Sequence, residues 1–97
     1  MIIELKKFDT MLISRPAGRE AFLALQSMLG ALKSDEKIEI DFRGILTFSP
    51  SWADEFLTPL INIYGDRLIL KIIKNPSVKL TLEIIEQNNG KKFKIKK

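Results

Sequence analysis

The spacing of hydrophobic residues predicts three amphipathic helices. The first extends from about Pro16 to Leu32, the second from the Ser49-Pro50-Ser51 turn to Gly65, and the third from Asn75-Pro76 to near Gly90. Apolar positions recur in each at the three- and four-residue spacing of one helix face. They are Ala21, Phe22, Leu25, Met28, Leu29 and Leu32; Ala53, Phe56, Leu57, Leu60, Ile61 and Tyr64; and Val78, Leu80, Leu82, Ile84 and Ile85.

Two residues interrupt these helical patterns. Gly18 lies in the first turn of the first helix, after the capping residue Ser14, where closely packed backbone or a ligand would require glycine. Pro59 lies within the second helix and removes the hydrogen bond to the Glu55 carbonyl. We therefore expect a kink at Pro59 or an end to the regular helix near Thr58.

Four stretches rich in apolar or alternating residues predict strands. They are Ile2 to Phe8, Ile38 to Phe42, Arg67 to Ile73, and the alternating run Lys92 to Lys96. Met11-Leu12-Ile13 either extends the first strand or forms a short one of its own. The third strand has apolar residues on both faces, which indicates an interior strand covered from two sides. In the last strand we expect Phe93 and Ile95 to point inward and the lysines outward.

The elements follow the order β-α-β-α-β-α-β in one domain, residues 1–97, without a linker or repeat. This order predicts an α/β fold: a single-layer, mixed but mostly parallel sheet of about four strands with three helices. Right-handed crossovers then place the loop between residues 42 and 51 at the carboxyl end of an interior strand. Open sheets usually bind their ligands there.

A hydroxyl group lies at the start of the second helix. Ser51 and Asp54 form an acidic variant of the capping box, whereas Ser49 followed by Pro50 offers a cap with proline in the first helical position. The free amides and the positive dipole end of a helix stabilise anions, so a serine here can carry a phosphate at reduced electrostatic cost.

The segment from Ile38 to Leu57, with its aspartate-bearing strand, apolar loop, serine pair and apolar helix, resembles the centre of STAS domains, the fold of bacterial anti-sigma-factor antagonists. Ser14 to Arg19 together with Ser49 to Phe56 resembles the STAS-like domain family of unknown function, over roughly residues 10–88. The resemblance implies a STAS-like fold and a non-catalytic regulatory domain with protein partners of the histidine-kinase-like ATPase type.

The resemblance also implies a switch. Ser51 matches the serine that is phosphorylated in anti-sigma-factor antagonists, and Ser49 is a second candidate. The chain departs from those proteins in two places: Ser49 replaces an acidic residue, and Trp52 replaces the glycine after the phosphoserine. Structural capping by Ser51 is the alternative to a switch.

An apolar patch made of Phe48, Pro50 and Trp52, together with Asp54 and Glu55 on the following helix, is our predicted partner surface. Tryptophan is enriched among interface hot spots, and a phosphate beside it would disrupt such a contact. The alternative is burial of Trp52 against the first helix.

The net charge of +4 is a property of the C-terminal residues. Residues 1–90 contain eleven basic and twelve acidic residues and so carry −1. The remaining basic residues are Lys91, Lys92, Lys94, Lys96 and Lys97. An edge strand whose lysines discourage aggregation explains them, and an anion or nucleic-acid contact is the alternative.

Histidine and cysteine are absent, which removes the usual zinc ligands, a cysteine nucleophile and the imidazole base. Carboxylate chemistry by Asp41, Asp54 and Glu55 is the remaining catalytic alternative, and Arg15 and Lys74 are the alternative anion ligands. We expect no enzyme activity, no cofactor and no metal. Because no apolar run reaches the roughly 20 residues of a membrane span, we expect a soluble, cytoplasmic protein.

Overall fold

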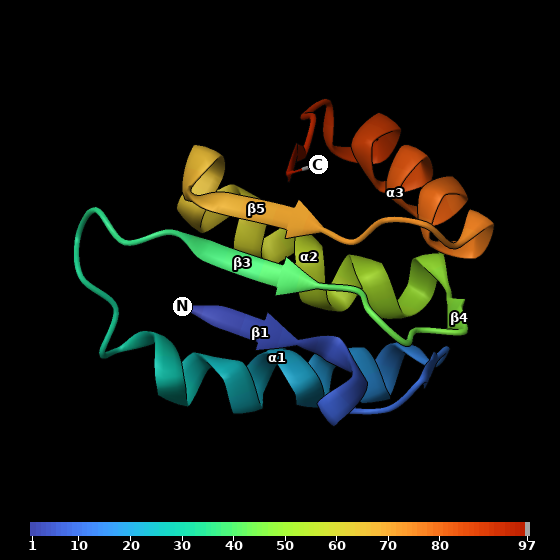
Figure 1. Cartoon of the computed structure of the whole chain (residues 1–97), viewed down its shortest axis with the longest axis horizontal. Coiled ribbons are helices and arrows are strands. Elements are labelled where there is room, and N and C mark those ends of the chain that lie inside the picture. Colours follow the sequence, from blue (N-terminus) through green and yellow to red (C-terminus); the bar gives the residue numbers. More distant parts are fainter. Residues whose placement is uncertain (97) are drawn as a thin grey trace.

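The computed structural model describes residues 1–96, which form a parallel four-stranded sheet, a separate two-stranded pair and three helices (Figure 1). The sheet comprises β1 (Ile2–Glu4), β3 (Ile38–Asp41), β5 (Leu68–Lys71) and β6 (Lys94–Lys96), and the pair comprises β2 (Met11–Leu12) and β4 (Thr47–Phe48). The helices are α1 (Arg15–Leu29), α2 (Pro50–Tyr64) and α3 (Pro76–Asn89), with short 3-10 turns η1 (Leu5–Lys7) and η2 (Gly65–Arg67).

The spatial order of the four strands, β1-β3-β5-β6, follows their order in the chain, and every neighbouring pair is parallel. Each crossover therefore steps in the same direction across the sheet. Since such crossovers are right-handed, all three helices belong on one side of it. Figure 1 shows α2 passing behind the strands while the opposite face points toward the viewer. The predicted α/β class is confirmed.

The covered face of the sheet holds the centre of the core. Ile3, Ile40 and Leu70 are in register on neighbouring strands and are almost completely buried. Ile2, Glu39 and Ile69 lie in register on the other face, where Ile2 is 57% exposed and the other two are half-buried. The expectation that β5 is covered from two sides is therefore wrong, because a sheet wound in one direction has helices on one side.

α1 and α2 cross at Gly18. A Cβ atom at this position would lie 2.5 Å from the Trp52 carbonyl oxygen and 2.9 Å from its Cα. No side chain fits that space, so glycine is required by closely packed backbone, one of the two predicted reasons. α1 ends at Leu29, three residues before the predicted end.

Several boundaries differ from the prediction because local geometry overrides the pattern. β1 ends at Glu4 in the turn η1, and Met11–Leu12 forms the separate strand β2. α2 continues through Pro59 to Tyr64, so a helix end near Thr58 is wrong. β5 ends at Lys71 because Ile72 adopts a positive φ of 62°.

The last strand is parallel to β5 and only partly follows its predicted pattern. Phe93, just before it, is buried at 8% exposure as expected. Ile95 is in register with the buried Leu70 and points to the helix side as predicted, but it is 50% exposed. Lys97 lies outside the described residues.

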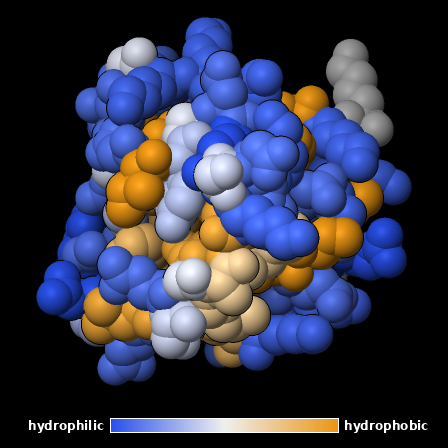
Figure 2. Space-filling view, turned by 90° about the vertical axis from the view of Figure 1, so that its left-hand side faces the viewer, coloured by the Kyte–Doolittle hydropathy of each residue, from blue (hydrophilic) through white to orange (hydrophobic). Residues whose placement is uncertain are grey.

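The end of the molecule at the left of Figure 1, where the N-terminus lies, has a mostly hydrophilic surface with small groups of apolar residues between charged ones (Figure 2). In the part of the chain that the structure describes, no helix has the length and apolar character needed to cross a bilayer.

Candidate functional site

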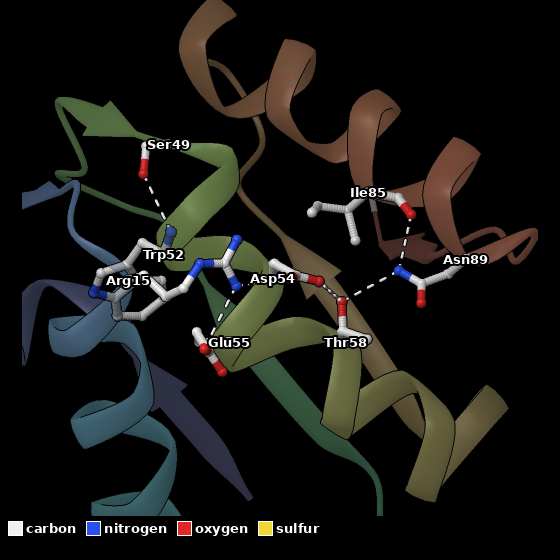
Figure 3. A network of polar contacts seen from close by, with 8 residues as sticks. All are labelled: Arg15, Ser49, Trp52, Asp54, Glu55, Thr58, Ile85 and Asn89. Atoms are coloured by element: carbon white, nitrogen blue, oxygen red, sulfur yellow. Dashed lines mark hydrogen bonds and ion pairs between the residues drawn. The ribbon is translucent and has the colours of Figure 1, made fainter.

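Ser49, not Ser51, caps α2. The Ser49 Oγ accepts a hydrogen bond from the Trp52 backbone N–H at 3.2 Å and donates to the Ile13 carbonyl, and Pro50 occupies the first helical position (Figure 3). The predicted alternative of a Ser51 cap is therefore wrong. Proline explains the choice, because its fixed φ suits the first helical position and places the cap on the preceding residue.

Phe48 and Trp52 belong to the core. Each is only 1% exposed, and the Trp52 ring lies 4.8 Å from the Phe56 ring and 5.8 Å from the Phe48 ring, measured between centroids. The predicted contact patch of Phe48, Pro50 and Trp52 is thus wrong, since only Pro50 is exposed. Trp52 is buried, as the alternative predicted, and its backbone lies against the first helix at Gly18.

Ser51, Asp54 and Glu55 lie on the side of α2 that faces away from the sheet. Residues spaced by three and four positions are neighbours on a helix surface, and these three are half-buried. We call this group, together with the exposed Pro50, the α2 face. The Arg15 guanidinium spans it, with Nη1 2.8 Å from Asp54 Oδ2 and 3.4 Å from Glu55 Oε1.

A chain of hydrogen bonds connects this ion pair to α3 (Figure 3). Thr58 Oγ1 donates to Asp54 Oδ1 at 2.9 Å, and the Asn89 amide donates to Thr58 Oγ1 at 3.2 Å and to the Ile85 carbonyl at 3.0 Å. The hydrogen bond from Arg15 lowers the pKa of Asp54, and that from Thr58 lowers it further. Asp54 is therefore held as a carboxylate, suited to ion pairing.

The same contacts raise the pKa of Arg15, chiefly through the hydrogen bond that it donates to Asp54 and also through the one that it donates to Glu55. Arg15 was a predicted ligand for an anion, and its partners are instead these two carboxylates. Lys74, the other candidate, is exposed. The next residue, Asn75, donates hydrogen bonds from its side-chain amide to the Ile45 and Leu46 carbonyls. Its side-chain oxygen accepts a hydrogen bond from the Ser77 N–H and so caps α3.

The three carboxylates considered for catalysis do not come together. Ile38 and Ile40 point toward the helices, so Asp41 points to the opposite face of the sheet, where it accepts a hydrogen bond from the Arg43 N–H at 2.8 Å. Asp54 and Glu55 lie beyond α2 on the other side. Within residues 1–96, no group of three or more acidic residues is placed to hold a metal ion.

Two of the C-terminal lysines are bound within the fold. Lys91 Nζ donates to Asn62 at 2.9 Å, and Lys96 Nζ lies 3.2 Å from Glu39 on the open face of the sheet. Lys94 is exposed on the edge strand, Lys92 is exposed just before it, and Lys97 lies outside the described residues. The nucleic-acid alternative stays a prediction, testable by salt-dependent retention on a polyanion.

A groove of about 550 Å³ extends the α2 face toward α1. Arg19, Phe22, Glu55 and Asn62 are among the residues that line it. Thr58, which donates a hydrogen bond to Asp54, also lines the groove. Neither Thr58 nor Asn89 was predicted from the sequence as a residue of the site. A polar residue four positions after Asp54 is the signal that would have pointed to Thr58, whereas the Asn89 contact depends on how α3 packs.

Comparison with known proteins gives one family. A family model described as a STAS-like domain of unknown function matches residues 25–81, which include β3, the serine turn, α2 and the start of α3. The Ser14 to Arg19 motif lies outside the match. No curated protein and no solved structure matches the chain.

Proposed function

The chain belongs to the family of STAS-like domains of unknown function, and we propose that it is a non-catalytic protein-interaction domain that contacts its partner through the α2 face. The groove between α1 and α2 extends this surface. Phosphorylation of Ser51 is the regulatory step of the proposal.

The free hydroxyl of Ser51 carries the proposal. Ser49 caps the helix, so the Ser51 side chain is left without a hydrogen bond among the described residues and is half-exposed at the second helical position. Ser49 is the weaker candidate, since its Oγ is already bound to the Trp52 N–H and the Ile13 carbonyl. A kinase would have to break both bonds to modify it.

A phosphate on Ser51 would change the charge of the α2 face. It adds about −1.5 to −2 charges three and four residues before Asp54 and Glu55, where like charges repel. The helix dipole favours the anion at this position. Arg15 is close enough to these carboxylates to shift toward the phosphate, and its 3.4 Å contact with Glu55 is the longer of its two ion pairs.

The partner class rests on the resemblance to anti-sigma-factor antagonists, which implies a histidine-kinase-like ATPase. The same resemblance makes a kinase of this type the agent that modifies Ser51. The unphosphorylated chain is the binding form, because a doubly charged group in the centre of a contact surface must be desolvated on association.

Affinity measurements test the proposal. A pull-down with the wild-type chain identifies the partner, and the dissociation constants of wild type, Ser51→Ala and Ser51→Asp are then compared. We expect Ser51→Ala to bind like wild type and Ser51→Asp to bind at least about tenfold more weakly, because a charge is placed within the contact.

Ser34→Asp is the matched control, since Ser34 is exposed in the loop between α1 and β3. It adds the same charge away from the α2 face and should bind like wild type. Equal binding by all the variants would exclude Ser51 as a switch. Equal weakening by Ser34→Asp and Ser51→Asp would show a general charge effect and contradict the proposed surface.

A further inference from the structure

A hollow of about 690 Å³ lies between α3 and the carboxyl ends of β5 and β6, and it shares no lining residue with the α1–α2 groove. Its size falls within the range of about 300–1,000 Å³ that small-molecule sites occupy. Ile72, Ile73, Leu82 and Ile95 supply its apolar lining. The carboxyl ends of parallel strands are also the usual place for such sites.

The hollow exists because α3 does not cover β6. Ile95 is in register with Leu70 on β5, so both side chains point to the helix side of the sheet, yet Leu70 is fully buried and Ile95 is 50% exposed. On α3, the residues that line the hollow are spaced as one helix face, with Leu82 at its floor between Lys79 and Glu86. The space between α3 and β6, which core side chains would normally fill, is therefore open to a ligand.

The backbone at the mouth of the hollow is strained. Ile72 has a φ of 62°, a left-handed conformation that β-branched residues rarely adopt. It is the only non-glycine residue with positive φ in residues 1–96. Backbone strain of this kind persists where the surroundings require it and gathers at ligand sites. This observation is independent of the hollow's shape.

Four lysines line the hollow, Lys71, Lys74, Lys79 and Lys96. Lys71 and Lys96 are in register with each other, one residue after Leu70 and Ile95, so their side chains point to the open face of the sheet. Lys74 and Lys79, both exposed, are the rim lysines.

Within the described residues the two rim lysines form no ion pair, while Lys96 pairs with Glu39 on the open face. Two acids also line the hollow, of which Glu86 is turned to the backbone and accepts a hydrogen bond from the Phe93 N–H at 2.8 Å. Lys74 and Lys79 therefore provide two exposed ammonium groups beside an apolar interior.

We propose that this hollow binds an aliphatic monoanion of the fatty-acid class, with the chain on Leu82 and Ile95 and the carboxylate among the rim lysines. An apolar interior takes the chain, and the two rim ammonium groups complement a single negative head group. This site is separate from the α2 face and does not depend on the proposed partner.

Calorimetric titration of the full chain with decanoate tests the proposal. Saturable one-site binding is expected, and decanol, which has the same chain without charge, should bind more weakly. Lys74→Glu and Lys79→Glu should each weaken decanoate binding by about two- to fivefold, as expected for exposed charge pairs. Lys33→Glu, the same change in the exposed loop after α1, should leave it unchanged.

A second pair of variants tests the apolar part. Ile95→Ser should weaken decanoate binding without unfolding the chain, since Ile95 is already half exposed, and Leu80→Ser, on α3 but outside the hollow at 61% exposure, should not. Absence of saturable binding, or binding that all these variants leave intact, would overturn the proposal. Binding to anionic vesicles with none to free decanoate would also overturn it, in favour of a membrane surface.

Discussion

At the scale of single residues, Gly18 and Trp52 determine how α1 meets α2. The indole is buried among aromatic rings, and its backbone touches the position where Gly18 has no side chain. The sequence predicted that either closely packed backbone or a ligand requires glycine at position 18, and did not decide between them. It was not sufficient to predict Trp52 as the neighbour, because that contact joins residues 34 positions apart.

We predict that Gly18→Ala destabilises the chain. The added methyl group would lie 2.5 Å from a backbone oxygen, so α1 must move away from α2. Overpacking costs about 1–3 kcal/mol and alanine returns up to about 1 kcal/mol of helix propensity, which leaves a net loss of up to about 2 kcal/mol when that gain is fully realised. Urea unfolding measures it.

Gly30→Ala is the control, because Gly30 has helical dihedral angles and open space around the added methyl group. It should change the free energy of unfolding by less than about 0.5 kcal/mol or stabilise the chain. If both variants unfold like wild type, the close approach of α1 and α2 is refuted.

Asp54 gives a prediction on pH. Since its pKa is lowered in the folded chain, the ion pair with Arg15 contributes stability above the ordinary aspartate pKa of about 3.9 and loses it as the pH falls through the lowered value. A carboxyl NMR titration should show the Asp54 midpoint rising in Arg15→Gln. Arg19→Gln, a neutralised arginine on the same helix, should leave the midpoint where it is in wild type.

At the scale of elements, helices were easier to predict than strands. α3 was correct from Asn75 to Gly90 because a cap, a proline and a terminal glycine mark both ends. β5 was too long in the prediction, because its apolar run continues through Ile72, whose positive φ has no sequence signal. The choice between Ser49 and Ser51 was also open, since both are good capping residues.

The cap yields a prediction of its own. Ser49→Ala should destabilise the chain by about 1 kcal/mol, within the range of about 0.5–2, because the Trp52 N–H loses its acceptor and the Ile13 carbonyl loses a donor. Ser51→Ala should change stability by less than about 0.5 kcal/mol. Thermal unfolding of both variants distinguishes the two roles, and a larger loss for Ser51→Ala would reverse the assignment.

At the scale of the whole molecule, the one-directional order of strands leaves an open sheet face and places the helices together. The element order predicted the parallel sheet, but an apolar run such as Leu68 to Ile73 suggested cover on both faces. Side-chain alternation in Lys92 to Lys96 predicted the direction in which Ile95 points. The alternation could not show that α3 leaves the edge strand β6 partly uncovered.

Two opposite surfaces of the molecule are available for the proposed partner. The helix layer presents Ser51, Asp54 and Glu55 on the α2 face, whereas the open sheet face presents Ile2, Glu39 and Ile69. Because the two surfaces lie on opposite sides of the molecule, a single measurement separates them.

That measurement is an amide NMR titration of the labelled chain with its protein partner. We predict that signals of Ser51, Asp54, Glu55 and Asn62 shift or broaden first, and that the same signals stay unperturbed when Ser51 is phosphorylated before the titration. Perturbations confined to β1, β3 and β5, with the amides of α2 unchanged, would show that the partner binds the open sheet face and not the α2 face.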